Sequence, residues 1–380
     1  MSFITVHVLR ALPMHNLNRD QNGLPKSQFD GGIQRARLSS QSIKRPARIA
    51  FRQAVAGLSS APASTRTMDS NAAKMVVSIA TDLAAQQGKN LDQAQAKKSA
   101  DSVVKSLAKR GAEPKPDGED KAADKKDNIL LFSDAELEML AQAVVDEQNG
   151  GTEAGVDDFI QDFKSPSLDI AAFGRMFAAR ADKSTHAAVA VSHAITTHEM
   201  SLTIDYFTAV DEFEDDSPAT DAGAGHLGLA YYTSGVYYST FTIDPAQLRR
   251  SWSGFSGKTA RSQVEALVKS LVEALPSGKL TNTNAHTKPL LVLVENQKTR
   301  TVYEFETPVS RSDDGGYTQT SVAALARQYA SAREFDADNF VDSIVYTSVG
   351  GEFADAARVG SIDEVASRTA ALAFAQGEPS

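Results

Sequence analysis

The sequence predicts an α+β fold that carries one large helical insertion. Alternation of apolar and polar residues with a period of two occurs near the N-terminus and again after residue 186, as in half-buried strands. Between these regions, apolar residues recur at helical spacing. The 380 residues exceed one minimal domain, so we expect two units or one core with a large insertion.

The first elements are a strand over residues 2–9 and a loop over 13–32 that contains two prolines and three glycines. A helix follows, with Gly57 as its expected end. Pro46 fits a first helical turn but not a helix interior, so the helix should begin only a few residues before it. Three serines can cap its start: Ser39, Ser40 and Ser42.

Residues 69–183 are predicted to be a helical insertion. Apolar residues recur at helical spacing over 72–85, 94–109 and 134–146. The segment 111–128 is too polar and charged to fold alone, and we expect it to be a mobile loop.

The strand pattern returns from residue 186 and continues over 201–210. An acidic, Gly/Ala-rich segment over 211–226 is expected to be flexible. Residues 226–244 are rich in aromatic and β-branched residues and predict two strands joined near Ser234 and Gly235.

The last third alternates helices and strands, and no internal repeat is found. Apolar residues over 264–275 mark an amphipathic helix. Strands are expected near 289–295 and 341–348, with a helix around 320–332 between them. A final helix begins at a capping box, Ser361 to Glu364.

Composition excludes several classes of site. The chain has no cysteine, which removes disulfides, thiolate metal ligands and cysteine nucleophiles. It has no apolar run of about 18 to 20 residues, and the N-terminus lacks the features of a signal peptide, so we expect a cytoplasmic protein without a membrane partner. The net charge of −9 argues against indiscriminate nucleic-acid binding, although not against a local site.

A basic stretch stands out against this acidic background. Between residues 31 and 68 there is no Asp or Glu, and there are seven basic residues: Arg35, Arg37, Lys44, Arg45, Arg48, Arg52 and Arg66. The stretch surrounds a predicted helix start, where free N–H groups and the helix dipole favour phosphate. Neutralising five phosphates of a single strand would give a salt slope of about −3.5. The alternative is a solvated basic helix face.

Other groups of candidate functional residues are less specific signals of a site. His193 and His198 are five residues apart, which does not match the zinc-binding spacing of a helix, and we expect no metal site there. Asp20 and Asp30 could hold a catalytic metal beside bound phosphates, but Asp is more typical of turns. Met176 is expected in the core rather than as a wedge between bases.

Seven ordered motifs resemble one known family, and they span most of the first 240 residues. They are LNRD (17–20), GGIQRARLSSQSIKR (31–45), GRM (174–176), SHAITTH (192–198), DYFTAVD (205–211), HLG (226–228) and SGVYY (234–238). Together they resemble the CasC family, the backbone subunit of the type I-E CRISPR surveillance complex Cascade. The helical insertion and the last third match the family only loosely.

The resemblance implies a modified RRM-like (ferredoxin-like) palm over 1–60 and 184–380, with helical fingers over 61–183. A long thumb loop is implied over about 196–232. Such subunits are non-catalytic and use no cofactor. Several copies oligomerise along the CRISPR RNA (crRNA), kink it periodically, and leave its bases free to pair with target DNA in antiviral defense. The implied partners are crRNA, target DNA through the guide, further copies of the chain, and the Cascade subunits CasA, CasB, CasD and CasE.

The resemblance also implies site residues. The RNA-binding candidates are Asn18, Arg19, Lys26, Arg35, Arg37, Ser39, Ser40, Gln41, Ser42, Lys44, Arg45, Arg48, Arg175 and Met176. The thumb candidates are Thr196, Thr197, His198, His226, Leu227 and Gly228. Met176 becomes the expected wedge at the RNA kink, which reverses the preference for the core. Ile33 and Gln34 stand where relatives can be more basic, and Pro46 is unusual in its helix.

Two alternatives remain open at this stage. Related backbone subunits of type III complexes cleave RNA, so the chain could be a metal-dependent ribonuclease that uses Asp30 or Asp20. It could also be an interaction protein whose basic helix binds an acidic partner.

Overall fold

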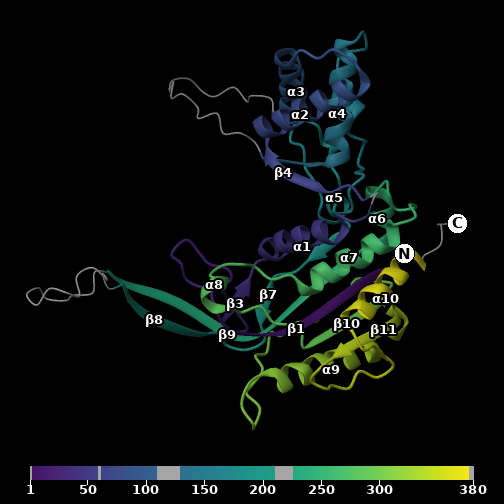
Figure 1. The fold of residues 1–380 in the computed structure, drawn as a ribbon. Helices are drawn as coiled ribbons and strands as arrows, with labels where there is room; N and C mark the ends of the chain where they lie inside the picture. The colour runs from purple at the N-terminus through teal and green to yellow at the C-terminus, as the bar shows by residue number, and fades with distance from the viewer. Residues whose placement is uncertain (1, 59–60, 109–128, 210–225, 376–380) are drawn as a thin grey trace, which may run out of the picture.

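The computed structural model describes residues 2–58, 61–108, 129–209 and 226–375. Within these ranges, ten strands form one mixed sheet that runs across the middle of the molecule (Figure 1). The strands of the main path lie in the order β12-β11-β10-β1-β9-β7-β3-β2, and β6 and β8 also pair with β9. None of the described helices is long and apolar enough to cross a membrane.

The element bounds are as follows. The strands are β1 (Phe3–His15), β2 (Ser27–Asp30), β3 (Ile33–Leu38), β4 (Ser64–Met68), β5 (Ile129–Ser133), β6 (Val189–Val191), β7 (Ala194–Thr196), β8 (Ser201–Ala209), β9 (His226–Ile243), β10 (Leu291–Gln297), β11 (Phe340–Thr347) and β12 (Ala357–Arg358). The helices are α1 (Ser40–Val55), α2 (Asp69–Gln87), α3 (Gln93–Ala108), α4 (Asp134–Gln148), α5 (Leu168–Phe173), α6 (Pro245–Ser251), α7 (Ala260–Glu273), α8 (Leu280–Thr283), α9 (Thr318–Phe335) and α10 (Ile362–Ala375).

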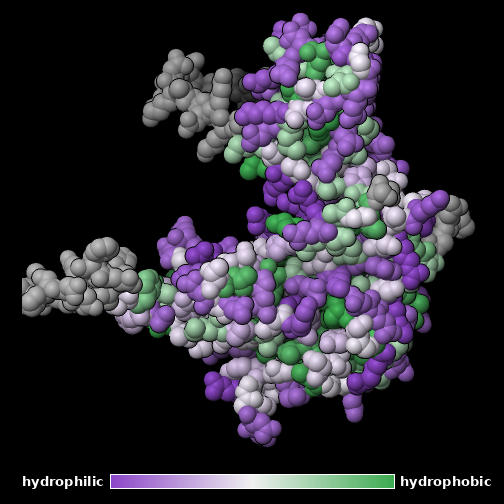
Figure 2. Space-filling view, in the orientation of Figure 1, coloured by the Kyte–Doolittle hydropathy of each residue, from purple (hydrophilic) through white to green (hydrophobic). Residues whose placement is uncertain are grey.

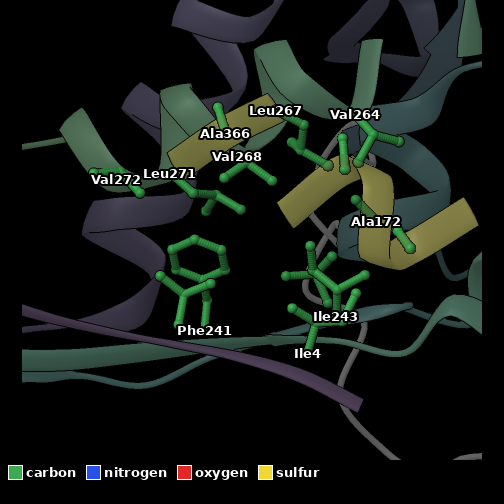
Figure 3. Packing of buried hydrophobic residues seen from close by; sticks show 14 of the residues in the cluster. Ile4, Ala172, Phe241, Ile243, Val264, Leu267, Val268, Leu271, Val272 and Ala366 are labelled. Atoms are coloured by element: carbon green, nitrogen blue, oxygen red, sulfur yellow. The ribbon is translucent and has the colours of Figure 1, made fainter. Parts of the chain in front are cut away.

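The central strands are covered by helices on both faces (Figure 1). On one face, Ile4 and Phe241 of neighbouring strands point toward Val268 of α7, with α1 and α10 alongside (Figure 3). On the other face, Leu9 and Leu293 pack with α9. The strand predicted to be half-buried is therefore buried on both faces, as is usual for the centre of a covered sheet.

Helices α2, α3 and α4 form a separate bundle with its own core, which includes Phe132 and Leu140. The antiparallel ribbon of β4 and β5 connects this bundle to the sheet, and the bundle stands away from the sheet (Figure 1). We call α2–α4 the helical bundle. The three helices expected here are present, whereas the expected mobile loop over 111–128 lies outside the described residues.

Two predicted boundaries near the sheet edge are wrong. The segment 13–32 is not all loop, because β1 continues to His15 and β2 pairs with β3. The turn of this β2–β3 hairpin contains Gly31 and Gly32, both at positive φ, which suits the tight turns that match strand twist. A β carbon at Gly31 would also collide with the carbonyl oxygen of Glu306, at 1.9 Å.

Strand β9 is one continuous strand of 18 residues and not two strands joined at Ser234 and Gly235. The glycine serves packing rather than a turn. A β carbon at Gly235 would lie 2.7 Å from Nε2 of His198, so the strand can pass the buried imidazole only with glycine there. The N-terminal half of β9 pairs with β8, and the hairpin of these two strands projects from the rest of the molecule (Figure 1).

Pro46 lies in the interior of α1, although the sequence predicted the first turn. The helix begins at Ser40, so Pro46 is its seventh residue. Burial of the apolar stripe formed by Ile43, Ala47 and Phe51 stabilises the helix against this disruption.

Arg35 of β3 connects several elements at this sheet edge through hydrogen bonds. Its guanidinium is buried and donates to the carbonyl oxygens of Thr196 (2.8 Å), Phe305 and Glu306 (3.1 Å), while Nε donates to that of Asp30 (3.3 Å). Burial lowers the pKa of Arg35, and the nearby carboxylates of Asp30, Glu304 and Glu306 oppose that shift. One side chain thus ties together the β2–β3 turn, β7 and the segment after β10.

We expect Arg35→Met to lower the free energy of unfolding by roughly 3 kcal/mol, because several buried carbonyl oxygens lose their donor. Denaturant unfolding measures this change. Arg45→Met is the control, since Arg45 is exposed and the same substitution there should cost no more than about 0.5 kcal/mol. An equal loss of unfolding free energy at both positions would contradict this structural role of Arg35.

His15 ends β1 as a buried, neutral imidazole. Its Nδ1 accepts from the N–H of Leu17 (3.3 Å), which places the proton on Nε2, where it donates to Oη of Tyr237 (3.0 Å). Burial lowers the pKa of His15 to about 4. The unfolded chain therefore binds a proton below pH 6.5 that the folded chain binds only below about pH 4.

His15 should accordingly make stability fall with pH in a defined window. Between pH 6.5 and 4 the unfolded state gains a proton first, so this residue should cost about 3 kcal/mol of stability across the window. We expect His15→Gln to remove that part of the pH dependence in urea unfolding measured from pH 7 to 4. The control is His286→Gln, at an exposed histidine. Parallel pH profiles for wild type and His15→Gln would refute the prediction.

Candidate nucleic-acid interface

Helix α1 starts directly after β3, and its first turn is closed by side chains of the protein itself. Ser39 is the N-cap, and its Oγ accepts from the N–H of Ser42 (3.4 Å). The N–H of Ser39 donates to Oδ1 of Asn18 (2.9 Å), and that of Ser40 donates to Nδ1 of His193 (2.8 Å). The expectation that this helix start offers free N–H groups to phosphate is therefore wrong for these three donors.

Three of the basic side chains of α1 instead line a groove of about 380 Å³ beside the helix. The polar stripe of α1 lies opposite its buried apolar stripe and contributes Gln41, Lys44, Arg45 and Arg48. The other wall comprises Arg66 of β4, Ile129 and Leu131 of β5, and the segment Phe173 to Met176. Figure 2 shows the hollow between the helical bundle and the sheet, with strongly hydrophilic residues in it.

Positive charge in this groove is only partly offset by the described residues. Within the described ranges, none of the cations Lys44, Arg45, Arg48 and Arg66 has a carboxylate within 4 Å. Burial lowers the pKa of Lys44 and of Arg48. For Arg48, Asp169 opposes that shift, while Arg66, Arg52 and Arg45 add to it by like-charge repulsion. An anion in the groove would relieve this repulsion.

A second basic cluster lies at the N-terminal end of α1. Burial lowers the pKa of His193, and the charges of Arg37 and Lys26 lower it further. The N–H of Arg37 donates to the carbonyl oxygen of Lys26 (2.8 Å), so these two residues are neighbours. The loop over 17–26 is held by the bond from the N–H of Lys26 to the carbonyl of Asn18 (2.8 Å) and borders a shallow groove that includes Arg19. The cations of the two clusters therefore flank one helix.

Met176 is exposed, with 78% of its surface accessible, and it lines the groove. The interpretation of Met176 as a core residue is wrong. Gly174 ends α5 at φ +80, a conformation that favours glycine, and Ala187 would lie only 3.2 Å from a β carbon there, so the chain turns sharply before Met176. The next residue after this turn, Arg175, points inward, and Met176 points outward.

The remaining RNA-binding candidates have internal partners. The guanidinium of Arg175 is buried and pairs with Glu136 at 2.6 Å. Arg35 is committed to backbone carbonyls as described above. Ser42 Oγ donates to the carbonyl of Ser39 (2.7 Å), within α1. The structure thus brings Gln41, Lys44, Arg45, Arg48 and Met176 into one groove but directs Arg35 and Arg175 inward.

The thumb candidates divide into two groups. Thr196, Thr197 and His198 are buried in the sheet at the base of the β8–β9 hairpin, and the ring of His198 stacks on Tyr317 with centroids 3.6 Å apart. Gly228 lies opposite Phe207 in the hairpin. His226 and Leu227 begin β9, and the expected flexible loop lies outside the described residues except for its last position.

Sequence reasoning missed part of the interface. Arg66 was counted in the acid-free stretch but was not assigned to the site, because only the β4–β5 ribbon brings it beside α1. Leu202, Ile204 and Tyr206 are exposed on one face of the β8–β9 hairpin together with Leu229. Their period-two spacing was a signal that could have identified this face.

The two aspartates considered for metal binding interact with residues that are close to them in the sequence. Oδ1 of Asp20 accepts from the N–H groups of Asn22 (2.8 Å) and Leu24 (3.0 Å), as in a turn. Asp30 lies 3.8 Å from the guanidinium of Arg35. Over the described parts of the chain, no three His, Asp or Glu residues are grouped so that they could hold a metal ion.

Comparisons with known proteins identify one family and two similar solved structures. A family model described as CT1975-like protein matches residues 4–368. A chain of the solved structure "CRISPR RNA-guided surveillance complex, pre-nicking" is 28% identical, with a TM-score of 0.72 over 98% of this chain and 100% of that chain. A chain of a "CRISPR RNA-guided surveillance complex" is 22% identical, with a TM-score of 0.62 and the same coverage, and shows similarity of fold. No curated protein matches the sequence.

Proposed function

The chain belongs to the Cas family of CT1975-like proteins, and we propose that it is a non-catalytic, crRNA-binding backbone subunit of a type I-E Cascade complex, as in the CasC family. Its partners are the crRNA, further copies of the chain, and the subunits CasA, CasB, CasD and CasE, in a cytoplasmic ribonucleoprotein. Target DNA is bound by pairing with the guide.

The observation that carries this proposal is the positive groove along α1, in which four cations form no ion pair within the described ranges. Its cations lie in a row at helical spacing, so they can follow a phosphate backbone without reading bases. The likeness to a chain of an RNA-guided surveillance complex supports the same ligand. Sequence recognition is then left to base pairing, which requires only backbone and shape contacts from the protein.

The elements correspond to the parts of a hand. The ten-stranded sheet with its covering helices is the RRM-like palm, the helical bundle is the fingers, and the β8–β9 hairpin is the base of the thumb. Met176, exposed in the groove, is the wedge that unstacks the RNA at each kink. The kinks leave the intervening bases free to pair with the target.

Reversing two charges in the groove should abolish assembly on RNA. We expect Lys44→Glu with Arg45→Glu to prevent formation of the ribonucleoprotein, since two attractive phosphate contacts become repulsive. Size-exclusion chromatography on a defined guide RNA and circular dichroism measure assembly and folding. The control, Lys258→Glu with Arg327→Glu, makes the same change in net charge at exposed positions away from the groove. A double variant with a native spectrum and full RNA binding would show that the groove is assigned wrongly.

Removing the wedge should separate RNA binding from target pairing. We expect Met176→Ala to weaken target-DNA affinity clearly while crRNA affinity falls only modestly, because the phosphate contacts remain. Affinities of the assembled complex for a matched duplex report the first effect. Met139→Ala is the control, at a partly exposed methionine of α4 that does not line the groove. Unchanged target binding by Met176→Ala would contradict the wedge role.

A further inference from the structure

At the start of α4, one carboxylate oxygen of Glu136 accepts two hydrogen bonds. Its Oε2 accepts from the N–H of Ser133 (2.8 Å), and Ser133 Oγ accepts from the N–H of Glu136 (3.2 Å), which completes the capping box of the helix. The same Oε2 accepts from Nη1 of Arg175 (2.6 Å). Both charged side chains are almost completely buried.

Arg175 bonds to the wall of the groove that lies opposite α1 at two places. Its Nη1 also donates to the carbonyl oxygen of Leu131 in β5 (3.2 Å), and Leu131 is paired with Arg66 of β4. Its backbone pairs with Thr185 in both directions, so the peptide that leads to Met176 is fixed from the other side. The guanidinium lies 4.7 Å from the ring centre of Phe177, within the core of the helical bundle.

The capping carboxylate is the only charged partner of Arg175 within the described ranges. Nε and Nη2 of Arg175 are buried and have no hydrogen-bond partner among the described residues. The ion pair with Glu136, together with the bond to Leu131, therefore holds this guanidinium inward. Without it, the charged group would lose its compensation in a buried place and should move toward the groove that it already lines.

We propose that Glu136 is a positioning residue of the RNA groove. It holds Arg175 inward, and Arg175 in turn fixes the outward direction of Met176 and the place of β5 opposite Arg66. The start of a helix in the bundle thereby sets the geometry of a site whose cations come mainly from α1. This inference rests on the proposed function of the groove and of Met176.

The variant Glu136→Gln tests the ion pair with little change in volume. Glutamine keeps an acceptor for the N–H of Ser133 but lacks the charge that holds Arg175. Glu147→Gln is the matched control, because Glu147 lies on the same helix and also accepts two bonds within the bundle, from Ser99 (2.9 Å) and Ala154 (3.2 Å), but does not line the groove.

The readout is the fluorescence of 2-aminopurine placed at successive guide positions of the assembled complex, which rises where a base is unstacked. We expect wild type and Glu147→Gln to show a periodic rise and Glu136→Gln to show a much weaker one. Target-DNA affinity of Glu136→Gln should fall roughly 3- to 30-fold, as for other mutations that act through a buried network. The salt slope of crRNA binding should not become shallower, because the phosphate contacts of α1 remain.

A purely structural role for Glu136 would lower the melting temperature and leave the periodic signal intact at temperatures where the complex is folded. That result, or the same fluorescence pattern and target affinity as wild type, would overturn the inference. If Glu136→Gln does not assemble, Arg175→Lys keeps the positive charge, removes the second bond to Leu131, and should give the same weakened signal. A wild-type complex without any periodic signal would refute the proposed kink itself, and with it this role of Glu136.

Discussion

The buried guanidinium of Arg35 is the interaction on which the position of the groove depends. It joins the β2–β3 turn, β7 and the segment after β10 through backbone carbonyls, so it fixes the strand from which α1 begins. Arg37 lies on the same strand, and only Leu38 and Ser39 separate it from the first residue of the helix. Because an arginine bonded to carbonyls is not available to phosphate, the basic stretch performs two different tasks: Arg35 builds the sheet edge, and Lys44, Arg45 and Arg48 form the site.

The charged residues of the chain are also divided between two roles, ion pairs within the protein and the groove along α1. The chain carries a net charge of −9, and most ion pairs of the described residues lie in the helical bundle, in the segment 157–183 and on the helices that cover the sheet. Along α1, by contrast, the cations repel one another and form no ion pair within 4 Å among the described residues, and Asp169 offsets only part of the repulsion at Arg48. Over the 8 to 10 Å at which salt screens charge, such a groove attracts an anion whatever the net charge of the chain. An acidic protein with one strong, confined site for a nucleic-acid backbone is the physical result.

Much of this organisation could be predicted from the sequence, because strand and helix periods are local signals. The helices of the bundle, α7, α9 and α10 with its capping Ser361 all lie where the periodicity indicates. What the sequence does not contain is the partner of each side chain. The burial of Arg35 and Arg175 depends on Phe305 and Glu136, which are distant in the chain, and the exposure of Met176 depends on a turn at Gly174. The continuity of β9 through Gly235 likewise depends on His198, and the interior position of Pro46 on packing beneath α1.

The measurement that tests the central claim most directly is the identity of any nucleic acid that the protein carries. The tagged chain would be expressed beside a CRISPR array and its processing enzyme and purified, and the bound nucleic acid would be extracted and sequenced. We expect a uniform RNA with repeat-derived ends and spacer sequence, held in a large particle that dissociates at high salt. A clean monomer without RNA would contradict the proposal and would show that the groove serves another anion.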